Sequence, residues 1–284
     1  MKTTISTIYG AYLQACLFFK QPFELTPFTT LNEKHGVLPG VAPAAGEMPV
    51  VQYVAIGKQG HRGATGADGQ PYTTSNQHSP SDAGLYSQIP FHVRTMNNDL
   101  TLSERNSYGM RKIITVNGIK YIAYFLKRLD MTNARPAMTI NTKVNGVVSS
   151  KPFVPDSTNL SPTPPVLSGG EVLTASGQYL AIKSVIDVVF SATEIEAIIE
   201  GCRILYDNEA YAIISEIALV SGVDRQTQGE AANGQTIQYT DVVAAQIVGI
   251  LNTYHSLPAS NSQVKETMTL GTSDPMLLNT GLTS

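Results

Sequence analysis

The chain has 284 residues, and its 19 basic and 22 acidic side chains leave a formal net charge of -3. Only 14% of its residues are charged, whereas Thr, Ser, Asn and Gln together supply 79 of 284. With 42% apolar residues, this composition excludes a disordered tail, a coiled coil and a general nucleic-acid coat protein. The two cysteines, Cys16 and Cys202, exclude a disulfide framework.

The N-terminal segment is predicted to form a helix over residues 3–20, because apolar residues recur at helical spacing. These residues are Ile5, Ile8, Tyr12, Ala15 and Phe19, and we expect the helix to dock by the face that carries them. Gln14 interrupts the apolar run, and no small cleavage-site residues follow it, so an export signal is not expected. No run reaches the roughly 18 apolar residues of a membrane-spanning helix. We therefore expect a soluble chain that is synthesised inside the cell and has no membrane partner.

Residues 22–49 are predicted to be a proline-rich loop, and residues 50–56 a strand. Residues 57–88 follow as an unusually long Gly-, Ser- and Gln-rich loop, and such loops are commonly functional or disordered. Glycine recurs there at every third position, at Gly60, Gly63, Gly66 and Gly69. This is the spacing of collagen, but four triplets are too few for a triple helix. We interpret the segment as a glycine-rich loop that turns at Asp68-Gly69.

The middle of the chain is predicted to be β-rich. A strand begins at 89–94, and residues 111–116 and 119–126 flank Asn117-Gly118. Asn-Gly between apolar runs favours a β-hairpin, because a type I′ turn needs positive φ at both central residues. Asn145-Gly146 predicts a second hairpin, between residues 137–144 and 147–150.

A Pro-, Ser- and Gly-rich connector over residues 151–177 is the predicted boundary between an N-terminal region, 1–150, and a C-terminal region, 178–284. The two regions are also compatible with one packed domain. Alternation predicts a half-buried strand over residues 178–190. Ser191 and Glu194 then form a predicted capping box at the start of a helix.

The remaining elements are a strand over 210–220, a second helix over 242–254 capped by Thr240 and Asp241, and a last strand over 265–270. The second helix is apolar nearly all round, which predicts that it is buried or covered by a partner. The fold class is therefore α+β. We expect a β-rich chain with long antiparallel strands and hairpins, two or three helices and long irregular loops.

The search for catalytic patterns yields no nucleotide-binding loop, no nucleophile elbow and no metal-type spacing of histidines or cysteines. We expect no enzymatic activity, no cofactor and no metal. Cys202 lies on the apolar stripe of a predicted helix and is interpreted as a buried small side chain. His78, Ser79 and Asp82 have the residue types of a catalytic triad, but we interpret them as turn formers. Asp187 and Glu216 are conceivable paired carboxylates, with a solvated strand face as the default interpretation.

Positive charge is concentrated between Glu104 and Arg135. The seven cations there are Arg105, Arg111, Lys112, Lys120, Lys127, Arg128 and Arg135, against two acids, Glu104 and Asp130. Aromatic residues lie among them, so nucleic-acid binding is a conceivable interpretation. We favour a strand pair whose charges face water or an acidic neighbouring chain, and nucleic acid is not an expected partner.

Four segments resemble tailed-bacteriophage virion structural proteins. They are residues 56–69, 121–130, 153–160 and 212–225, so the likeness is spread over most of the chain. Residues 215–219 are similar to a stretch in phage tail and baseplate proteins. Residues 121–130 look like a segment of the dimeric baseplate wedge protein of contractile-tailed phages. The resemblance implies a structural role without enzymatic activity and a location in the virion tail, in its baseplate.

The expected function is therefore that of a structural tail subunit, a baseplate wedge component that binds other tail or baseplate proteins and conceivably a second copy of itself. The alternatives are a neck, collar or connector protein, a capsid decoration protein, and a carbohydrate-binding receptor module. Expected contact regions are residues 57–88, the connector and the basic hairpin. The interface candidates are Lys120, Lys127, Arg128, Arg111, Arg62 and His61.

Overall fold

The computed structural model describes residues 4–145, 147–155, 172–231, 234–259 and 262–280. Half of the chain is strand and 18% is helix, which confirms the β-rich α+β class. The chain divides into two compact units, each assembled from two stretches of sequence. Unit 1 comprises Met1–Met131 and Asp187–Met268, and unit 2 comprises Thr132–Ile186 and Thr269–Ser284. Most of the predicted connector, residues 156–171, lies outside the described residues, as does part of the 153–160 segment.

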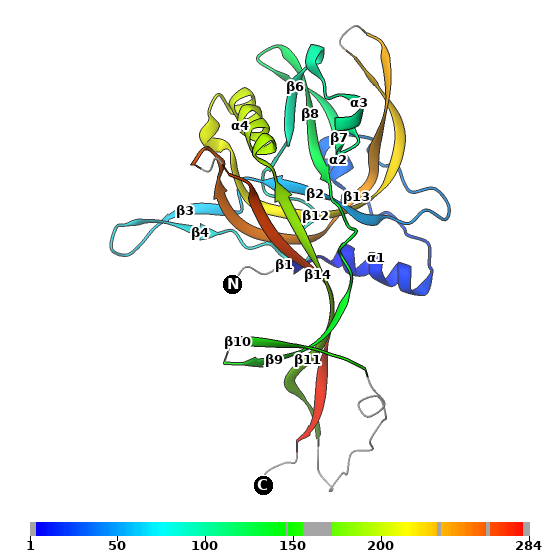
Figure 1. Cartoon of the computed structure of the whole chain (residues 1–284), viewed down its shortest axis with the longest axis vertical. Coiled ribbons are helices and arrows are strands. Elements are labelled where there is room, and N and C mark those ends of the chain that lie inside the picture. The colour runs from blue at the N-terminus through cyan, green and yellow to red at the C-terminus, as the bar shows by residue number, and fades with distance from the viewer. Residues whose placement is uncertain (1–3, 146, 156–171, 232–233, 260–261, 281–284) are drawn as a thin grey trace. The chain divides into compact units, whose positions relative to one another are not determined.

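Unit 1 is built on an eight-stranded sheet in the order β1-β13-β12-β2-β8-β6, with β5 paired to β2 and β7 to β8 (Figure 1). The pairings recorded between its strands are antiparallel. The strands are β1 (Thr4–Ser6), β2 (Val50–Gly57), β5 (Gln88–Ile89), β6 (His92–Thr95), β7 (Tyr108–Val116), β8 (Ile119–Arg128), β12 (Ile213–Glu230) and β13 (Thr236–Ser256). β2, β8, β12 and β13 supply most of its buried core, which includes Tyr53, Leu126, Val220 and Ile247.

The predicted helix over residues 242–254 is wrong, because these residues form the greater part of strand β13. Every residue from Val242 to Leu251 is buried. A strand covered on both faces has the same continuous apolar run as a buried helix, so the run does not distinguish them. The predicted cap residue Asp241 instead accepts hydrogen bonds from the amides of Met110, Arg111 and Val242, and burial raises the pKa of Asp241 to about 6.

The two longer helices of unit 1 were both predicted. α4 (Ala192–Tyr206) begins with the predicted capping box of Ser191 and Glu194. It packs against β6, and Gly201 permits this because a Cβ there would lie 3.1 Å from Val93 Cγ2. α1 (Ile8–Phe19) follows β1 and is capped by Thr7. The short helices α2 (Leu31–His35) and α3 (Leu102–Arg105) also have capping boxes. Among the helices of the described residues, none is long and apolar enough to cross a membrane.

α1 docks by a different face from the predicted one. Its buried residues are Gly10, Leu13 and Cys16. A Cβ on Gly10 would lie 2.9 Å from the carbonyl oxygen of Val248, so the small residue lets the helix approach β13 closely. The predicted face is instead exposed, with Ile8 60%, Tyr12 41% and Phe19 65% accessible. α1 therefore docks by the face whose small residue allows the two backbones to come close. It does not dock by the face with the largest apolar side chains.

Both predicted Asn-Gly hairpins are present. β7 and β8 are joined by Asn117 and Gly118, whose φ values are +49° and +80°. β9 (Ala137–Val144) and β10 (Val147–Pro152) pair around Asn145, and Gly146 lies outside the described residues. The predicted long loop over residues 57–88 is wrong in part, because it contains a two-stranded hairpin of β3 (His61–Thr65) and β4 (Pro71–Ser75). Its turn contains the predicted Asp68-Gly69, with Gly69 at φ +78°.

Unit 2 contains a four-stranded sheet in the order β10-β9-β11-β14. β11 (Val172–Phe190) and β14 (Val264–Thr280) are longer than the predicted strands, and both extend past the residues of unit 2. Among its described side chains, the buried ones are Asn141, Ala181 and Ile186. The described part of this sheet therefore contributes few buried side chains.

Candidate functional site

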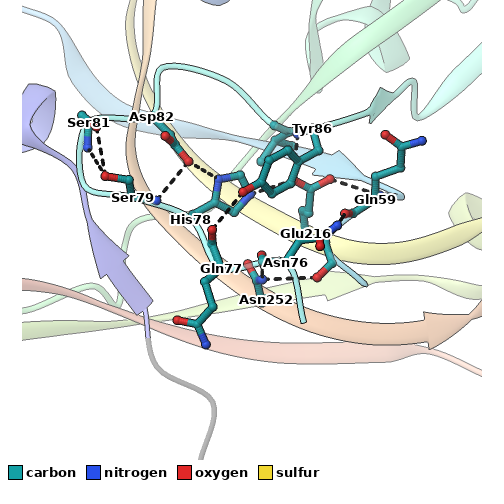
Figure 2. A network of polar contacts seen from close by, with 12 residues as sticks. Gln59, Asn76, Gln77, His78, Ser79, Ser81, Asp82, Tyr86, Glu216 and Asn252 are labelled. Atoms are coloured by element: carbon teal, nitrogen blue, oxygen red, sulfur yellow. Dashed lines mark hydrogen bonds and ion pairs between the residues drawn. The ribbon is translucent and has the colours of Figure 1, made fainter. Parts of the chain in front are cut away.

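A network of polar contacts in unit 1 surrounds the base of the β3–β4 hairpin (Figure 2). Its centre is Glu216 on β12, a carboxylate with no exposed surface. Two flanking loops reach this carboxylate, one joining β2 to β3 and the other running from β4 to β5. We call Gln59, His78, Asp82, Tyr86 and Glu216 the His78 network.

Glu216 lies in the sheet directly opposite Gly57 of β2. A Cβ on Gly57 would lie only 2.4 Å from Glu216 Oε2, so the glycine makes room for the carboxylate. The amide of Gln59 donates to Oε2 at 3.2 Å, and the amide of Tyr86 donates to Oε1 at 2.9 Å. Both loops are therefore fixed to one buried acidic group, which these donors and His78 satisfy.

His78 lies between two carboxylates, as Figure 2 shows. Its Nδ1 is 2.8 Å from Asp82 Oδ2, and its Nε2 is 2.8 Å from Glu216 Oε1. A doubly protonated ring can donate to both carboxylates at once, so this position favours the charged form of His78. Burial by itself lowers the pKa of His78, but the hydrogen bonds and charges of Glu216 and Asp82 outweigh it and raise that pKa above its usual value.

The segment around His78 is tied to itself as well as to the sheet. The Ser79 amide donates to Asp82 Oδ2 at 3.0 Å, and the Tyr86 hydroxyl donates to the Gln77 carbonyl at 2.9 Å. The Tyr86 ring stacks on the His78 ring with centroids 4.4 Å apart. The His78 ring is thus enclosed on its face and at both nitrogens.

The two ends of the β3–β4 hairpin are held by polar side chains of β12 and β13. Gly60 donates its amide to Ser215 Oγ at 2.8 Å. Asn252 donates to Ser75 Oγ at 2.8 Å and also contacts the carbonyls of Gly60 and Asn76. The hairpin therefore starts from a fixed base in unit 1.

This arrangement is suited to holding the chain and not to acid–base catalysis. His78 has no nitrogen left for a substrate, and its side chain is 1% exposed. Ser79 Oγ bonds to Ser81 Oγ at 3.0 Å, and no bond joins Ser79 Oγ to His78. These three triad-type residues therefore do not form a triad.

The suggested carboxylate pair of Asp187 and Glu216 is also not formed. Asp187 pairs with Lys265 at 2.8 Å, and the hydrogen bonds from Lys265 and Thr267 lower the pKa of Asp187. In the part of the chain that the structure describes, no group of three or more His, Cys, Asp or Glu side chains is placed to hold a metal ion. Cys202 is buried as predicted, and burial raises the pKa of its thiol to about 11, which disfavours the nucleophilic thiolate.

Four of the seven cations of the basic stretch lie close to acidic residues of the same chain. Arg111 on β7 pairs with Asp99 at 3.1 Å, and its side chain is 3% exposed. Asp99 also accepts from the Tyr124 hydroxyl at 2.6 Å and lies 3.9 Å from Arg105. The charge of Arg111 is therefore compensated inside unit 1.

Two further cations of this stretch, both on β8, are paired in the same way. Lys127 lies 2.7 Å from Glu194 of the α4 capping box, and Arg128 lies 2.9 Å from Asp224 on β12. Of the six interface candidates, Lys120 and Arg62 are exposed, and His61 is half-buried against Tyr254. Contact of any of the six with a partner stays a prediction.

The sequence predicted none of the pairing inside the His78 network. His78 and Glu216 are 138 residues apart, and no local pattern joins them. The packing around Glu216 requires glycine at positions 57 and 60, since a side chain at either position would collide with Glu216 or Ser215. A single sequence does not distinguish these glycines from turn glycines.

A family model described as a family of unknown function, DUF7208, matches residues 1–284. No curated protein and no solved structure matches the chain. The match spans both compact units and every residue of the His78 network. The chain is therefore a member of the DUF7208 family.

Proposed function

We propose that the chain is a structural subunit of a bacteriophage tail, a baseplate wedge component that acts by binding neighbouring tail proteins. The observation that carries the proposal is the outward surface of α1. The large apolar residues exposed there are Ile8, Tyr12, Leu17, Phe18 and Phe19, and we call them the α1 surface.

A helix that is apolar nearly all round is normally buried. α1 buries only Gly10, Leu13 and Cys16, while Phe18 is 81% and Phe19 65% exposed. A pocket of about 450 Å³ lies beside the end of the helix, with Cys16, Leu17, Phe23 and Met48 among its lining residues. Exposed apolar patches beside such hollows are typical of protein–protein contact sites. The α1 surface is thus suited to burial against another subunit.

Two further features support a structural role. The His78 network uses a buried imidazole ring to hold two loops, and both ring nitrogens are occupied by carboxylates. The resemblance of residues 56–69 and 121–130 to virion proteins supports the tail as the location. The basic stretch gives little support to nucleic-acid binding, because three of its cations pair with Asp99, Glu194 and Asp224.

The test is to produce particles of the encoding phage that carry the double variant Phe18→Ser, Phe19→Ser. We expect the purified variant to fold normally, because both rings are exposed, but to be missing from purified tails by mass spectrometry. Leu102→Ser is the matched control, since Leu102 is 61% exposed on a different helix. Normal incorporation of the double variant would contradict the role of the α1 surface, and absence of the wild-type chain from particles would contradict the function.

The position in the particle separates the alternatives. Labelling the chain and imaging intact virions should place it at the baseplate. A label at the neck or on the capsid would favour a connector or decoration protein, and glycan binding by the isolated chain would favour a receptor module.

A further inference from the structure

The β3–β4 hairpin is a two-stranded arm that projects from the rest of unit 1 (Figure 1). Its register pairs Gly63 with Thr73, between His61–Ser75 at the base and Thr65–Pro71 near the turn. In the described part of the chain no third strand joins this sheet. An isolated hairpin of this kind is only marginally stable in water. A further strand from a neighbouring chain would therefore stabilise the arm.

The backbone groups of the arm alternate between inward and outward directions. Gly66 donates to the Gln70 carbonyl and Asn76 to the Gly60 carbonyl, each at 2.8 Å. Since bonded and non-bonded pairs alternate in an antiparallel ladder, the even-numbered residues pair within the hairpin. The odd-numbered residues, His61, Gly63 and Thr65 on β3 and Pro71, Thr73 and Ser75 on β4, direct their amide and carbonyl groups outward.

The two outer edges differ in what they offer. On β4, Pro71 has no N–H, and a proline at an edge position blocks the addition of a strand. On β3, both Gly63 and Thr65 keep an outward N–H and C=O. Within the described residues β3 pairs with β4 alone, and in that pairing Gly63 and Thr65 occupy non-bonded positions. The β3 edge is therefore open to a further strand, whereas the β4 edge is interrupted.

The glycines that recur at every third position also indicate the β3 edge, because Gly63 differs from the other three. A Cβ on Gly60 would lie 2.3 Å from the Ser215 carbonyl oxygen, and one on Gly66 would lie 2.4 Å from Asp68 Oδ1. Gly69 has a positive φ of +78°. Neither steric crowding nor backbone conformation requires a glycine at position 63. Its φ is not positive, and a Cβ there would meet nothing within 4 Å. Glycine within a strand often marks close approach by another backbone, and here that backbone is not supplied by the arm.

We infer that the β3 edge, at Gly63 and Thr65, is a strand-addition site for an extended segment of a neighbouring tail protein. The occupant is an extended backbone because the edge offers alternating N–H and C=O groups at strand spacing. The exposed side chain of Arg62 and the half-buried His61 lie on the same strand and border the added segment. The identity of the neighbour as a tail protein rests on the proposed function.

The test compares Gly63→Pro with Thr73→Pro in phage particles. Both substitutions remove an outward N–H from the same register pair, so neither removes a bond of the hairpin itself. We expect Gly63→Pro to reduce the chain per purified tail about tenfold, the effect of roughly 1.4 kcal/mol of lost contact. Thr73→Pro should incorporate like the wild type, because Pro71 already interrupts its edge.

A second measurement needs no variant. Hydrogen exchange of peptides covering residues 61–66 and 71–76 is followed in the free chain and in purified tails. Slower exchange in tails for residues 61–66 alone supports the inference. Equal incorporation of both proline variants, with unchanged exchange at 61–66, would overturn it and leave the proposed function standing. Protection that appears in the free chain with rising concentration would assign the edge to a second copy and also overturn it. Absence of the wild-type chain from tails would overturn the proposed function and this partner together.

Discussion

His78 is a buried imidazole held between two carboxylates that differ in burial. Its side chain is 1% exposed, that of Glu216 is 0% and that of Asp82 is 31%. A buried ion pair is weak support for stability by itself, but removing one partner leaves the other as an uncompensated charge. The two losses therefore have unequal effects on stability. Removing His78 leaves the buried Glu216 carboxylate without its partner, whereas removing Asp82 leaves His78 still paired with Glu216.

We therefore expect His78→Leu to lower the free energy of unfolding by about 3–5 kcal/mol. Asp82→Asn should lower it by about 1 kcal/mol or less, because Asp82 is partly solvated. Denaturant titration of the purified variants measures both values. Similar losses for the two variants would contradict the central position of Glu216.

The raised pKa of His78 also predicts how stability depends on pH. The stabilisation is fully present below the unfolded pKa of 6.5 and is lost as pH rises through the higher folded pKa. Wild-type stability should therefore fall from pH 6.5 upward more steeply than that of His78→Leu. Asp241, with its pKa raised to about 6, gives a decline of the same sign, but it is common to both proteins and cancels in the comparison. Parallel curves for the two proteins would exclude this role of His78.

Elements that are specified by neighbouring residues could be predicted. The capping box of α4 and the Asn117-Gly118 hairpin depend on a few adjacent residues, and both are present. β13 could not be predicted as a strand. It is buried on both faces of the sheet, so its residues are apolar without alternation and look like a buried helix. The docking face of α1 was also missed, since it depends on the close approach of Gly10 to Val248.

The glycines of the arm provide a prediction for this hairpin. Gly60→Ala should destabilise the protein by about 1–3 kcal/mol, because its Cβ would be forced against the Ser215 carbonyl. Gly63→Ala should be neutral or stabilising by up to about 1 kcal/mol, since the new methyl group meets nothing and the unfolded chain loses freedom. Thermal unfolding of the two variants measures the difference. Equal effects would show that the two glycines are equivalent.

At the scale of the whole molecule, the charge summed along residues 104–135 is a poor guide to the charge on the protein surface. Lys127 and Arg128 are compensated by Glu194 and Asp224, which lie 67 and 96 residues away. The acids belong to elements that the fold brings beside β8, and no window of sequence contains both partners. The same reason prevented prediction of the link between His78 and Glu216.

The two units differ in how well they are buried. β12 and β13 lie in the interior of the unit 1 sheet, whereas every described residue of β10 is exposed. We expect amides of β12 and β13 to exchange only through large unfolding events and those of β9 and β10 through smaller local openings. Native-state hydrogen exchange with increasing denaturant measures these free energies. Equal values for the two sheets would mean that the units unfold as one.

The fixed base of the β3–β4 arm has a mechanical consequence. A pull applied to the arm passes through Gly60 and Asn252 into β12 and β13, which form the most extensive strand pairing of unit 1. A flexible root would absorb such a pull by bending before any force reached the sheet. Because its base is held by Ser215, Asn252 and the His78 network, we expect the arm to transmit tension to the sheet with little bending at its base.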